Sequence, residues 1–189
     1  MSTWIFLVVV VVVALWVVGA YNGLIALKNR VLNAWKQIDV QLKRRHDLIP
    51  NLIETVKGAM NFEKQTLEAV ISARNKAVSA QGVGATAKAE GELTQALGRL
   101  FALTEAYPDL KATGNVAQLQ EELTSTENKI SFARQLYNDE ATLYNTKQAQ
   151  FPTNLVTGLA KATPAELWEI EDAAKRAVPK VDFGFNKPS

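Results

Sequence analysis

The first 27 residues contain no charged side chain, and this segment limits what the rest of the chain can fold into. Residues 4–20 form an unbroken apolar run, WIFLVVVVVVALWVVGA, which as a helix is roughly 25 Å long; continuation to Leu27 gives roughly 36 Å. The hydrocarbon core of a bilayer is about 30 Å thick, so one helix suffices to cross it. We therefore predict a transmembrane anchor over residues 1–27, with Trp4, Trp16 and Tyr21 at the membrane interfaces.

A cleaved signal peptide is the alternative interpretation of this segment. The three residues before the apolar run, MST, carry no basic side chain, and the run is longer than the usual core of about 7–15 residues. VVGAYNG is also a poor match to a small-residue cleavage site. We therefore expect an anchor that is not cleaved.

The charges that flank the anchor predict its orientation. The N-terminal side has no Lys or Arg, whereas Lys28, Arg30 and Lys36 follow the anchor closely. The positive-inside rule then places the N-terminus outside and the remaining chain in the cytoplasm. The same three side chains are the candidates for contact with anionic lipid headgroups.

Beyond residue 21 the apolar residues recur at helical spacing, with no convincing strand alternation. We predict an all-α fold, in which the single transmembrane helix continues into an antiparallel bundle of three long helices plus a short C-terminal helix. The second helical pattern is interrupted at QGVGAT. The apolar positions of the first two patterns are Leu24, Val31, Trp35, Ile38, Leu42, Ile49, Leu52, Val56 and Ala59, then Phe62, Leu67, Val70, Ile71, Ala77, Val78, Leu93, Leu97, Leu100, Leu103 and Tyr107.

The third helical pattern repeats every seven residues, which is typical of a coiled-coil-like seam between long helices packed at about 20°. YPDLKATGN at 107–115 is rich in turn residues and predicts a loop before it. FPTN at 151–154 is expected to end it. The predicted seam consists of Val116, Leu123, Ile130, Tyr137, Tyr144 and Phe151.

A short helix is predicted after this bundle. Thr163 is a candidate N-cap, Pro164 suits the first helical position, and Glu166 completes a capping box. The predicted organisation is an anchor at 1–27, the bundle at 28–159, the additional helix at 160–178 and an extended tail at 179–189. The additional helix could dock on a neighbour or a membrane surface through Leu167, Trp168 and Ile170.

The stretch KRRHDLIP, residues 43–50, places charges and a proline inside the first helical pattern. Arg45 falls in a core row between Ile38 and Leu52, and a buried arginine needs a partner. We expect a polar layer in which Arg45 and Arg74 face Glu140 and fix the helix register. The alternative is that the bundle opens there and these side chains reach water. Pro50 is expected to kink the helix and to free a carbonyl near His46.

Few kinds of active site can be built from this composition. The chain has no cysteine and a single histidine, so thiolate chemistry and a multi-histidine metal site are excluded for one chain. We interpret His46 as a lone, partly exposed side chain. No convergent set of nucleophile, base and oxyanion donors is found, and nucleic-acid-binding motifs are absent too. We therefore expect no enzymatic activity, no cofactor, no metal and no nucleic-acid partner.

Charge is distributed unevenly along the chain. Residues 28–80 hold ten Lys/Arg against five Asp/Glu, and residues 81–150 hold six against nine. The basic and acidic parts either pair within one fold, pair between subunits, or are simply two solvated faces.

Five blocks of the sequence extend over most of residues 21–159: YNGLIALKNRVLNAWKQIDVQLKRRHDLIPNLIETVKG, TLEAVISARNKA, AYPDLKA, LQEELTSTENKISFARQLYN and YNTKQAQFPTNLVTGL. Together these blocks resemble the LemA family of bacterial membrane proteins. The resemblance implies a single-span protein with a long-helix bundle, in a family with no established enzymatic activity. Some relatives are associated with magnetosome biogenesis and others with envelope stress.

The resemblance also implies a set of motif residues, none of which has an assigned catalytic role. Beyond residue 159 the sequence departs from the expected short tail. The motif residues are Arg44, Arg45, Asp47, Leu48, Pro50, Asn51, Arg74, Arg134, Tyr137, Asn138, Tyr144, Asn145, Phe151 and Pro152.

From these observations we expect a scaffold in the bacterial inner membrane that associates with copies of itself and organises or remodels the bilayer, with membrane lipids as partners. The alternative is an adaptor or sensor that recruits another envelope protein, for example a membrane protease, in envelope stress.

Overall fold

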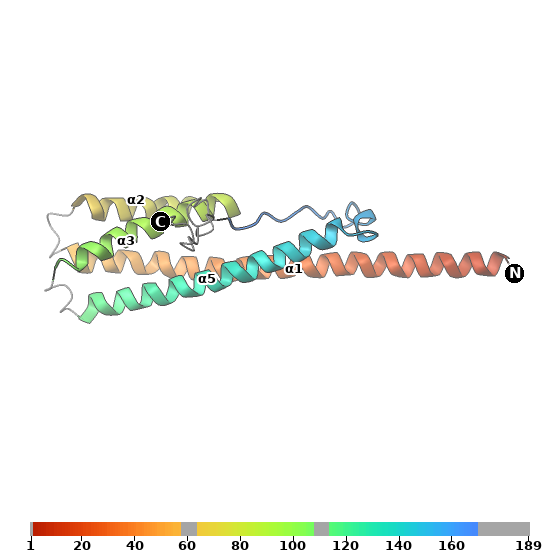
Figure 1. Ribbon diagram of the computed structural model, residues 1–189, viewed down its shortest axis with the longest axis horizontal. Coiled ribbons are helices and arrows are strands. Elements are labelled where there is room, and N and C mark those ends of the chain that lie inside the picture. The colour runs from red at the N-terminus through yellow and green to blue at the C-terminus, as the bar shows by residue number, and fades with distance from the viewer. Residues whose placement is uncertain (1, 58–63, 108–113, 170–189) are drawn as a thin grey trace, which may run out of the picture.

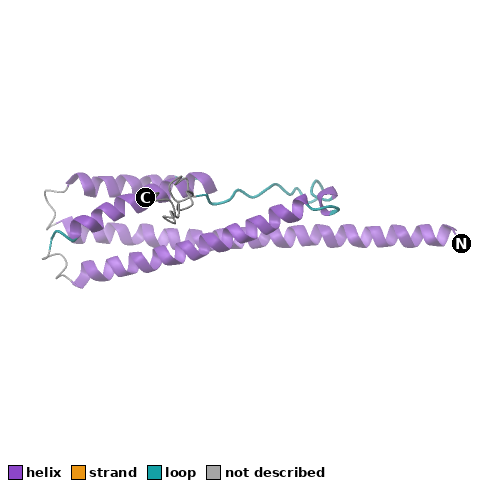
Figure 2. Cartoon of the chain, viewed as in Figure 1, coloured by secondary structure: helices purple, strands orange, loops and turns teal. Residues whose placement is uncertain are grey.

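The computed structural model describes residues 2–57, 64–107 and 114–169. Within these ranges the chain is entirely helical apart from turns and one extended segment, which confirms the predicted all-α fold (Figure 2). Helix α1 covers Ser2–Lys57, α2 Lys64–Ser79, α3 Val83–Thr104 and α5 Gly114–Ala149, and a 3-10 turn covers Thr153–Leu155. The molecule is a long rod, and the N-terminal part of α1 extends alone from one end (Figure 1).

Helix α1 has 56 residues, which corresponds to roughly 84 Å. Its N-terminal part is apolar and exposed, and Leu24 is its first buried residue. From there the buried positions follow the predicted rows, because apolar residues three, four or seven apart share one helix face. The helix continues through Pro50 as a single element.

The second helical pattern forms a hairpin of two helices rather than one interrupted helix. Successive helices alternate in direction, so α2 and α3 are antiparallel neighbours beside α1 and α5 (Figure 1). The chain reverses at Gly82, whose φ of 84° lies in the left-handed region that favours glycine. Ala59 and Phe62, and most of the predicted loop at 107–115, lie outside the described residues.

Two apolar clusters form the core. The first, at the end of the rod farthest from the N-terminus, receives side chains from all four helices, including Leu52, Val70, Leu93 and Leu123. The second runs along α1 and α5 towards the N-terminal end and contains Leu24, Ile38, Ile130, Tyr137 and Tyr144.

Five of the six predicted seam residues on α5 are buried, from Val116 to Tyr144. Phe151 is the exception, with 79% of its surface exposed. The seven-residue repeat fails there because α5 ends at Ala149, before the proline at 152, and the chain then leaves the helical path.

The prediction of a helix at 160–178 is wrong for residues 160–169, the part of this range that the structure describes. Residues 150–161 form a series of turns, which we call the turn region, and residues 162–169 form an extended segment, which we call the strap. The strap lies along the bundle and runs back from the end of α5 (Figure 1). Thr163, Pro164 and Glu166 are therefore not a capping box. Ile170, the remainder of that helix and the tail at 179–189 lie outside the described residues.

Candidate functional site

A buried ionic cluster lies between the two apolar clusters of the core. Glu90 of α3 is 3% exposed and interacts through both carboxylate oxygens. Arg45 Nη1 donates a hydrogen bond to Glu90 Oε2 at 3.0 Å, and His46 Nε2 lies 2.6 Å from Glu90 Oε1. Arg45 and His46 are consecutive in α1, so one carboxylate holds one turn of this helix.

The same cluster reaches all four helices of the bundle. Arg45 Nη1 is 3.1 Å from Glu127 Oε2 of α5, and Arg45 Nη2 donates to Thr94 Oγ1 of α3 at 2.7 Å. Arg74 of α2 donates from Nε to the backbone carbonyl of His46 at 3.3 Å. We call these six residues, Arg45, His46, Arg74, Glu90, Thr94 and Glu127, the polar layer.

The composition of the polar layer differs from the sequence prediction. Arg45 is 4% exposed, so the alternative in which this residue reaches water is wrong. Its acidic partners are Glu90 and Glu127, whereas Glu140 binds Arg30 Nη2 at 2.7 Å. Glu140 follows Glu127 by 13 residues, roughly 20 Å along α5, and is therefore too far towards the N-terminal end.

Two members of the polar layer were missed or misjudged from sequence. Glu90 lies within a row of buried α3 residues. An acidic residue at a position with core spacing is the sequence signal that could have identified it as a member of the polar layer. His46 is 9% exposed and hydrogen bonded, so its interpretation as a partly exposed side chain is wrong. The freed carbonyl near His46, by contrast, was predicted and is bound by Arg74.

The polar layer has the chemistry of a structural element. Its carboxylates face arginine and histidine side chains, and burying such charges is expensive unless each is paired. Burial also lowers the pKa of neighbouring Arg134, while the Glu127 carboxylate opposes that shift. Among residues 2–57, 64–107 and 114–169, no group of three or more His, Cys, Asp or Glu is placed to hold a metal ion.

A second polar arrangement holds the strap against α5. The side-chain amide of Asn145 donates to the Ala165 carbonyl and accepts from the Ala165 N–H, both at 2.8 Å. Asn138 makes the same two bonds with Trp168, at 3.1 and 2.8 Å. The two asparagines are seven residues apart, roughly 10.5 Å of helix, and three residues of extended chain span about 10 Å. This match explains why the segment is extended rather than helical.

Trp168 anchors the strap in the second apolar cluster. Trp168 is 4% exposed, its ring centroid lies 6.0 Å from that of Trp35, and the Arg134 guanidinium lies 5.4 Å from the same Trp168 centroid. Tyr137 donates from its hydroxyl to the Glu166 carbonyl at 2.6 Å. Trp168 thus docks within its own chain, not on a neighbour or membrane as the sequence had suggested, and Leu167 is partly buried against the same cluster.

The predicted membrane-interface residues lie on one helix but differ in surroundings. Trp4, Trp16 and Tyr21 are 75%, 37% and 40% exposed, so they are free to contact lipid; the contact itself stays a prediction. Lys36 is exposed and Lys28 is half-buried. Arg30 forms an ion pair with Glu140 of the same chain.

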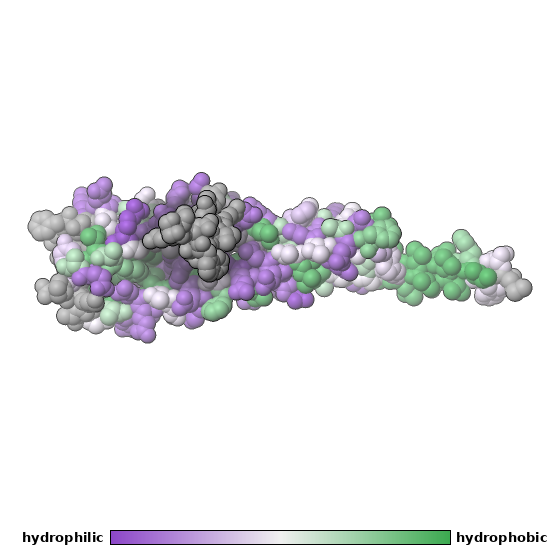
Figure 3. Space-filling view, in the orientation of Figure 1, coloured by the Kyte–Doolittle hydropathy of each residue, from purple (hydrophilic) through white to green (hydrophobic). Residues whose placement is uncertain are grey.

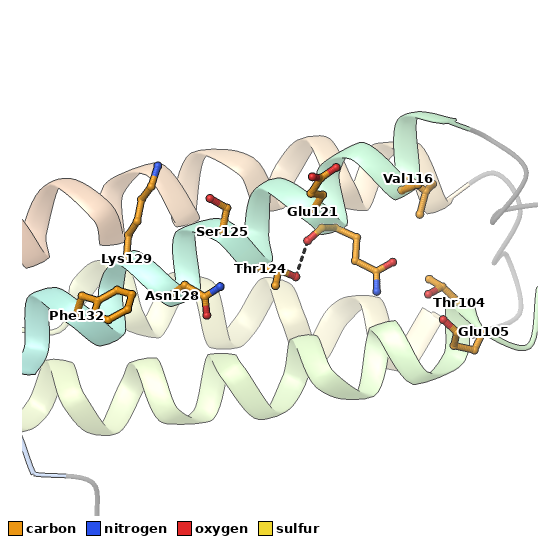
Figure 4. A pocket seen from close by; sticks show the side chains of 11 residues that line it. Thr104, Glu105, Val116, Glu121, Thr124, Ser125, Asn128, Lys129 and Phe132 are labelled. Carbon is orange, nitrogen blue, oxygen red and sulfur yellow. Dashed lines mark hydrogen bonds between the residues drawn. The ribbon is translucent and has the colours of Figure 1, made fainter.

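A groove of about 630 Å³ lies between the end of α3 and the first half of α5. Figure 4 shows a mixture of uncharged polar, charged and apolar side chains along it, with Phe132 at one end and Thr104 and Glu105 at the other. Thr124 uses its hydroxyl to bond the Gln120 carbonyl at 2.8 Å, inside its own helix. The groove offers surface for binding, but its side chains do not converge as a nucleophile and base would.

These features define a class of protein: an all-α bundle continuous with one helix that is long and apolar enough to cross a membrane. The chain belongs to the LemA family, whose model matches residues 34–183. This match continues past residue 159, where the last of the five resembling blocks ends, and so includes the strap. The family is not known as one of enzymes.

The relatives found include a protein named LemA and magnetosome proteins named MamQ. The chain is 33% identical over 141 residues to Protein LemA of Metamycoplasma hominis, which covers 74% of this chain and 64% of that protein. It is 23% identical over 171 residues to Magnetosome protein MamQ 2 of Paramagnetospirillum magneticum, covering 75% and 63%. A 170-residue match to Magnetosome protein MamQ of Magnetospirillum gryphiswaldense is also 23% identical, covering 75% and 62%.

The chain therefore spans slightly less than two thirds of the length of the curated relatives it matches. Family membership and the exposed apolar stretch of α1 together indicate a membrane-associated helical protein with a single span.

Proposed function

We propose that this protein is a non-catalytic scaffold of the bacterial inner membrane, whose bundles associate side by side on the cytoplasmic face. The observation that carries the proposal is an apolar stripe on the outer face of α5. Phe132, Leu136 and Leu143 are 73%, 39% and 46% exposed and share one helix face. Such a stripe on a soluble surface is a contact site for another molecule.

Helix α1 extends this stripe. Val40 is 62% exposed and, with Phe132 and Leu136, lines a groove of about 470 Å³ between α1 and α5. Lys36 and Lys129 also line this groove, so it combines apolar with charged side chains, as the core and rim of a protein interface do together.

The anchor restricts how two copies can meet. An antiparallel pair would place the two apolar α1 segments at opposite ends of the assembly, so one membrane could not hold both. Copies in one bilayer must therefore stand parallel, with α5 stripes at the same height above the membrane. Rigid rods that associate in this way hold their spans in a fixed arrangement, which is how the scaffold would organise or remodel the bilayer.

The mass of the intact protein in mild detergent tests this proposal. Mass photometry should show a uniform oligomer for the natural sequence. The double variant Phe132→Glu, Leu136→Glu should shift it to a smaller species, while Ser131→Glu should not, because residue 131 points about 100° away on the helix. A monomeric natural protein would contradict self-association.

An adaptor that recruits a different envelope protein is the second candidate function. The groove of Figure 4 favours it, because a cleft of that size between α3 and α5 suits an extended or helical segment of a partner. A monomer that co-purifies with one stoichiometric membrane protein, and loses it on Phe132→Glu, is the result that would support the adaptor.

A further inference from the structure

The turn region has one buried face and one apolar face that is exposed. Thr153, Val156 and Ala160 are 5%, 2% and 6% exposed and pack inward. Phe151, Leu155 and Leu159, spaced four residues apart, are 79%, 68% and 69% exposed. Three large apolar side chains on so short a segment form a patch that water disfavours, so a contact should cover it.

The position of this patch along the rod indicates what covers it. Ala160 belongs to the same buried cluster as Leu24 of α1. Leu24 follows the apolar run that ends at Ala20 by only four residues, roughly 6 Å of helix. In Figure 1 the turn region lies beside α1 at the N-terminal end of the bundle, where α1 begins to extend alone. The patch is therefore level with the end of the predicted span.

Exposed hydrophobic surface also covers the predicted span. Val11, Leu15 and Val18 are 56%, 67% and 56% exposed on the lone part of α1. Figure 3 shows hydrophobic residues over the turn region and again along this N-terminal stretch, with more hydrophilic residues covering the bundle.

The charges around the patch suit an anionic lipid surface. Residues 1–38 and 141–165 contain no Asp or Glu, but these two segments hold Lys28, Lys147 and Lys161. The two acids that flank residues 141–165 in sequence are Glu166 of the strap, whose carboxylate lies beside Gly84 of α3, and Glu140, which is bound to Arg30 at 2.7 Å. Lysines close to a bilayer surface are attracted to its anionic headgroups.

We propose that the turn region is a second membrane contact, in which Phe151, Leu155 and Leu159 enter the boundary between headgroups and acyl chains of the bilayer that holds α1. Lys147 and Lys161 then lie near anionic phospholipid headgroups. A single span alone leaves the bundle free to tilt and rotate about α1. Contact at a second element fixes which face of the bundle points along the membrane, and it does so for one copy without any association between copies.

The absence of cysteine allows a direct test with site-specific labels in the full-length chain. Leu155→Cys and Leu159→Cys variants carry a nitroxide and are reconstituted in vesicles of phosphatidylethanolamine and phosphatidylglycerol. Val11→Cys in the span is the lipid reference, and Thr124→Cys, exposed on the distant half of α5, is the aqueous reference. Electron paramagnetic resonance then measures the accessibility of each label to oxygen, which concentrates in lipid, and to a water-soluble nickel chelate.

The expected result is a severalfold higher ratio of oxygen to nickel accessibility at positions 155 and 159 than at position 124, approaching the ratio at position 11. A ratio at 155 and 159 equal to that at 124, with position 11 in lipid, would overturn the proposal and leave the span intact. Low accessibility to both agents would mean that another protein surface covers the patch, which also overturns it. An aqueous label at position 11 would remove the span on which the proposal rests. Oligomer mass is measured separately, so self-association can fail while this contact stands.

Discussion

Arg74 Nε donates a hydrogen bond to the backbone carbonyl of His46, with 3.3 Å between the two atoms. This carbonyl would ordinarily accept from the residue four positions later, but that residue is Pro50, which has no N–H. Proline within a helix costs about 3 kcal/mol, in part through the carbonyl left without a donor. The arginine of α2 therefore stabilises the turn of α1 that carries Arg45 and His46.

This relationship predicts energetic coupling between Arg74 and Pro50. Arg74→Ala should lower the free energy of unfolding by about 1.5–3 kcal/mol, the range for a hydrogen bond to a charged group. In a Pro50→Ala background the helix supplies its own donor, so the same substitution should cost less, with a coupling energy on the order of 1 kcal/mol. Chemical denaturation of the four proteins of this cycle, followed by circular dichroism in mild detergent, measures it. Equal costs in both backgrounds would show that the carbonyl does not need Arg74.

Glu90 should be the most sensitive carboxylate of the bundle. It is 3% exposed and neutralises Arg45 while contacting His46, so Glu90→Gln leaves a buried cation with Glu127 as its remaining acidic partner in the polar layer. Breaking a buried ion pair in this way costs about 3–5 kcal/mol. The matched control is Glu92→Gln, two residues later on α3, because Glu92 pairs with Lys76 at the surface and should cost about 0–1 kcal/mol. Thermal melts that show equal shifts for the two variants would mean that the polar layer is unimportant for stability.

The regular part of the fold could be predicted because helical periodicity is a local property. Rows such as Leu24, Val31 and Ile38 need only a continuous α1 for their spacing to place them on one face. The repeat on α5 was reliable to Tyr144 for the same reason. It failed at Phe151 because a helix end is decided by the residues that follow, here Pro152, and not by the repeat.

The candidate site was less predictable because it depends on contacts between distant segments. Arg45 could be recognised as a buried charge, but its partner Glu90 depends on how α2 and α3 fold back as a hairpin. The extended conformation of the strap could not be predicted for the same reason. Thr163 and Pro164 are a strong local signal for a helix start, and it is overridden by bonds to Asn138 and Asn145, which lie 20–30 residues earlier in the chain.

Asn145 and Asn138 should control how often the strap detaches. Each makes two hydrogen bonds with strap backbone, and at about 1 kcal/mol each, alanine substitution should lower the free energy of local opening by about 2 kcal/mol. The amides of Ala165 and Trp168 should then exchange hydrogen roughly thirtyfold faster. Asn128→Ala, an exposed asparagine of the same helix, is the matched control and should leave this exchange unchanged. If Asn138→Ala and Asn145→Ala behave like the control, Trp168 alone holds the strap.

Alkaline pH should weaken the bundle through the tyrosines that line its second apolar cluster. Burial raises the pKa of Tyr137 above its ordinary value of about 10, the Glu166 carboxylate raises it further, and burial also raises the pKa of Tyr144. Above about pH 10 the unfolded chain therefore releases these protons more readily than the folded chain, and binds fewer of them. The free energy of unfolding then falls as the pH rises.

Tyr137→Phe separates this effect from general alkaline denaturation. At neutral pH the variant should be less stable by about 1 kcal/mol, because the hydrogen bond to the Glu166 carbonyl is lost. Between about pH 9 and about pH 11 it should lose less stability than the natural sequence, and Tyr137→Phe with Tyr144→Phe should lose less still. Denaturation curves at each pH give the slopes. Parallel curves for the three proteins would place the alkaline transition elsewhere in the molecule and would mean that the Tyr137 hydroxyl ionises with the same pKa in the folded and unfolded chain.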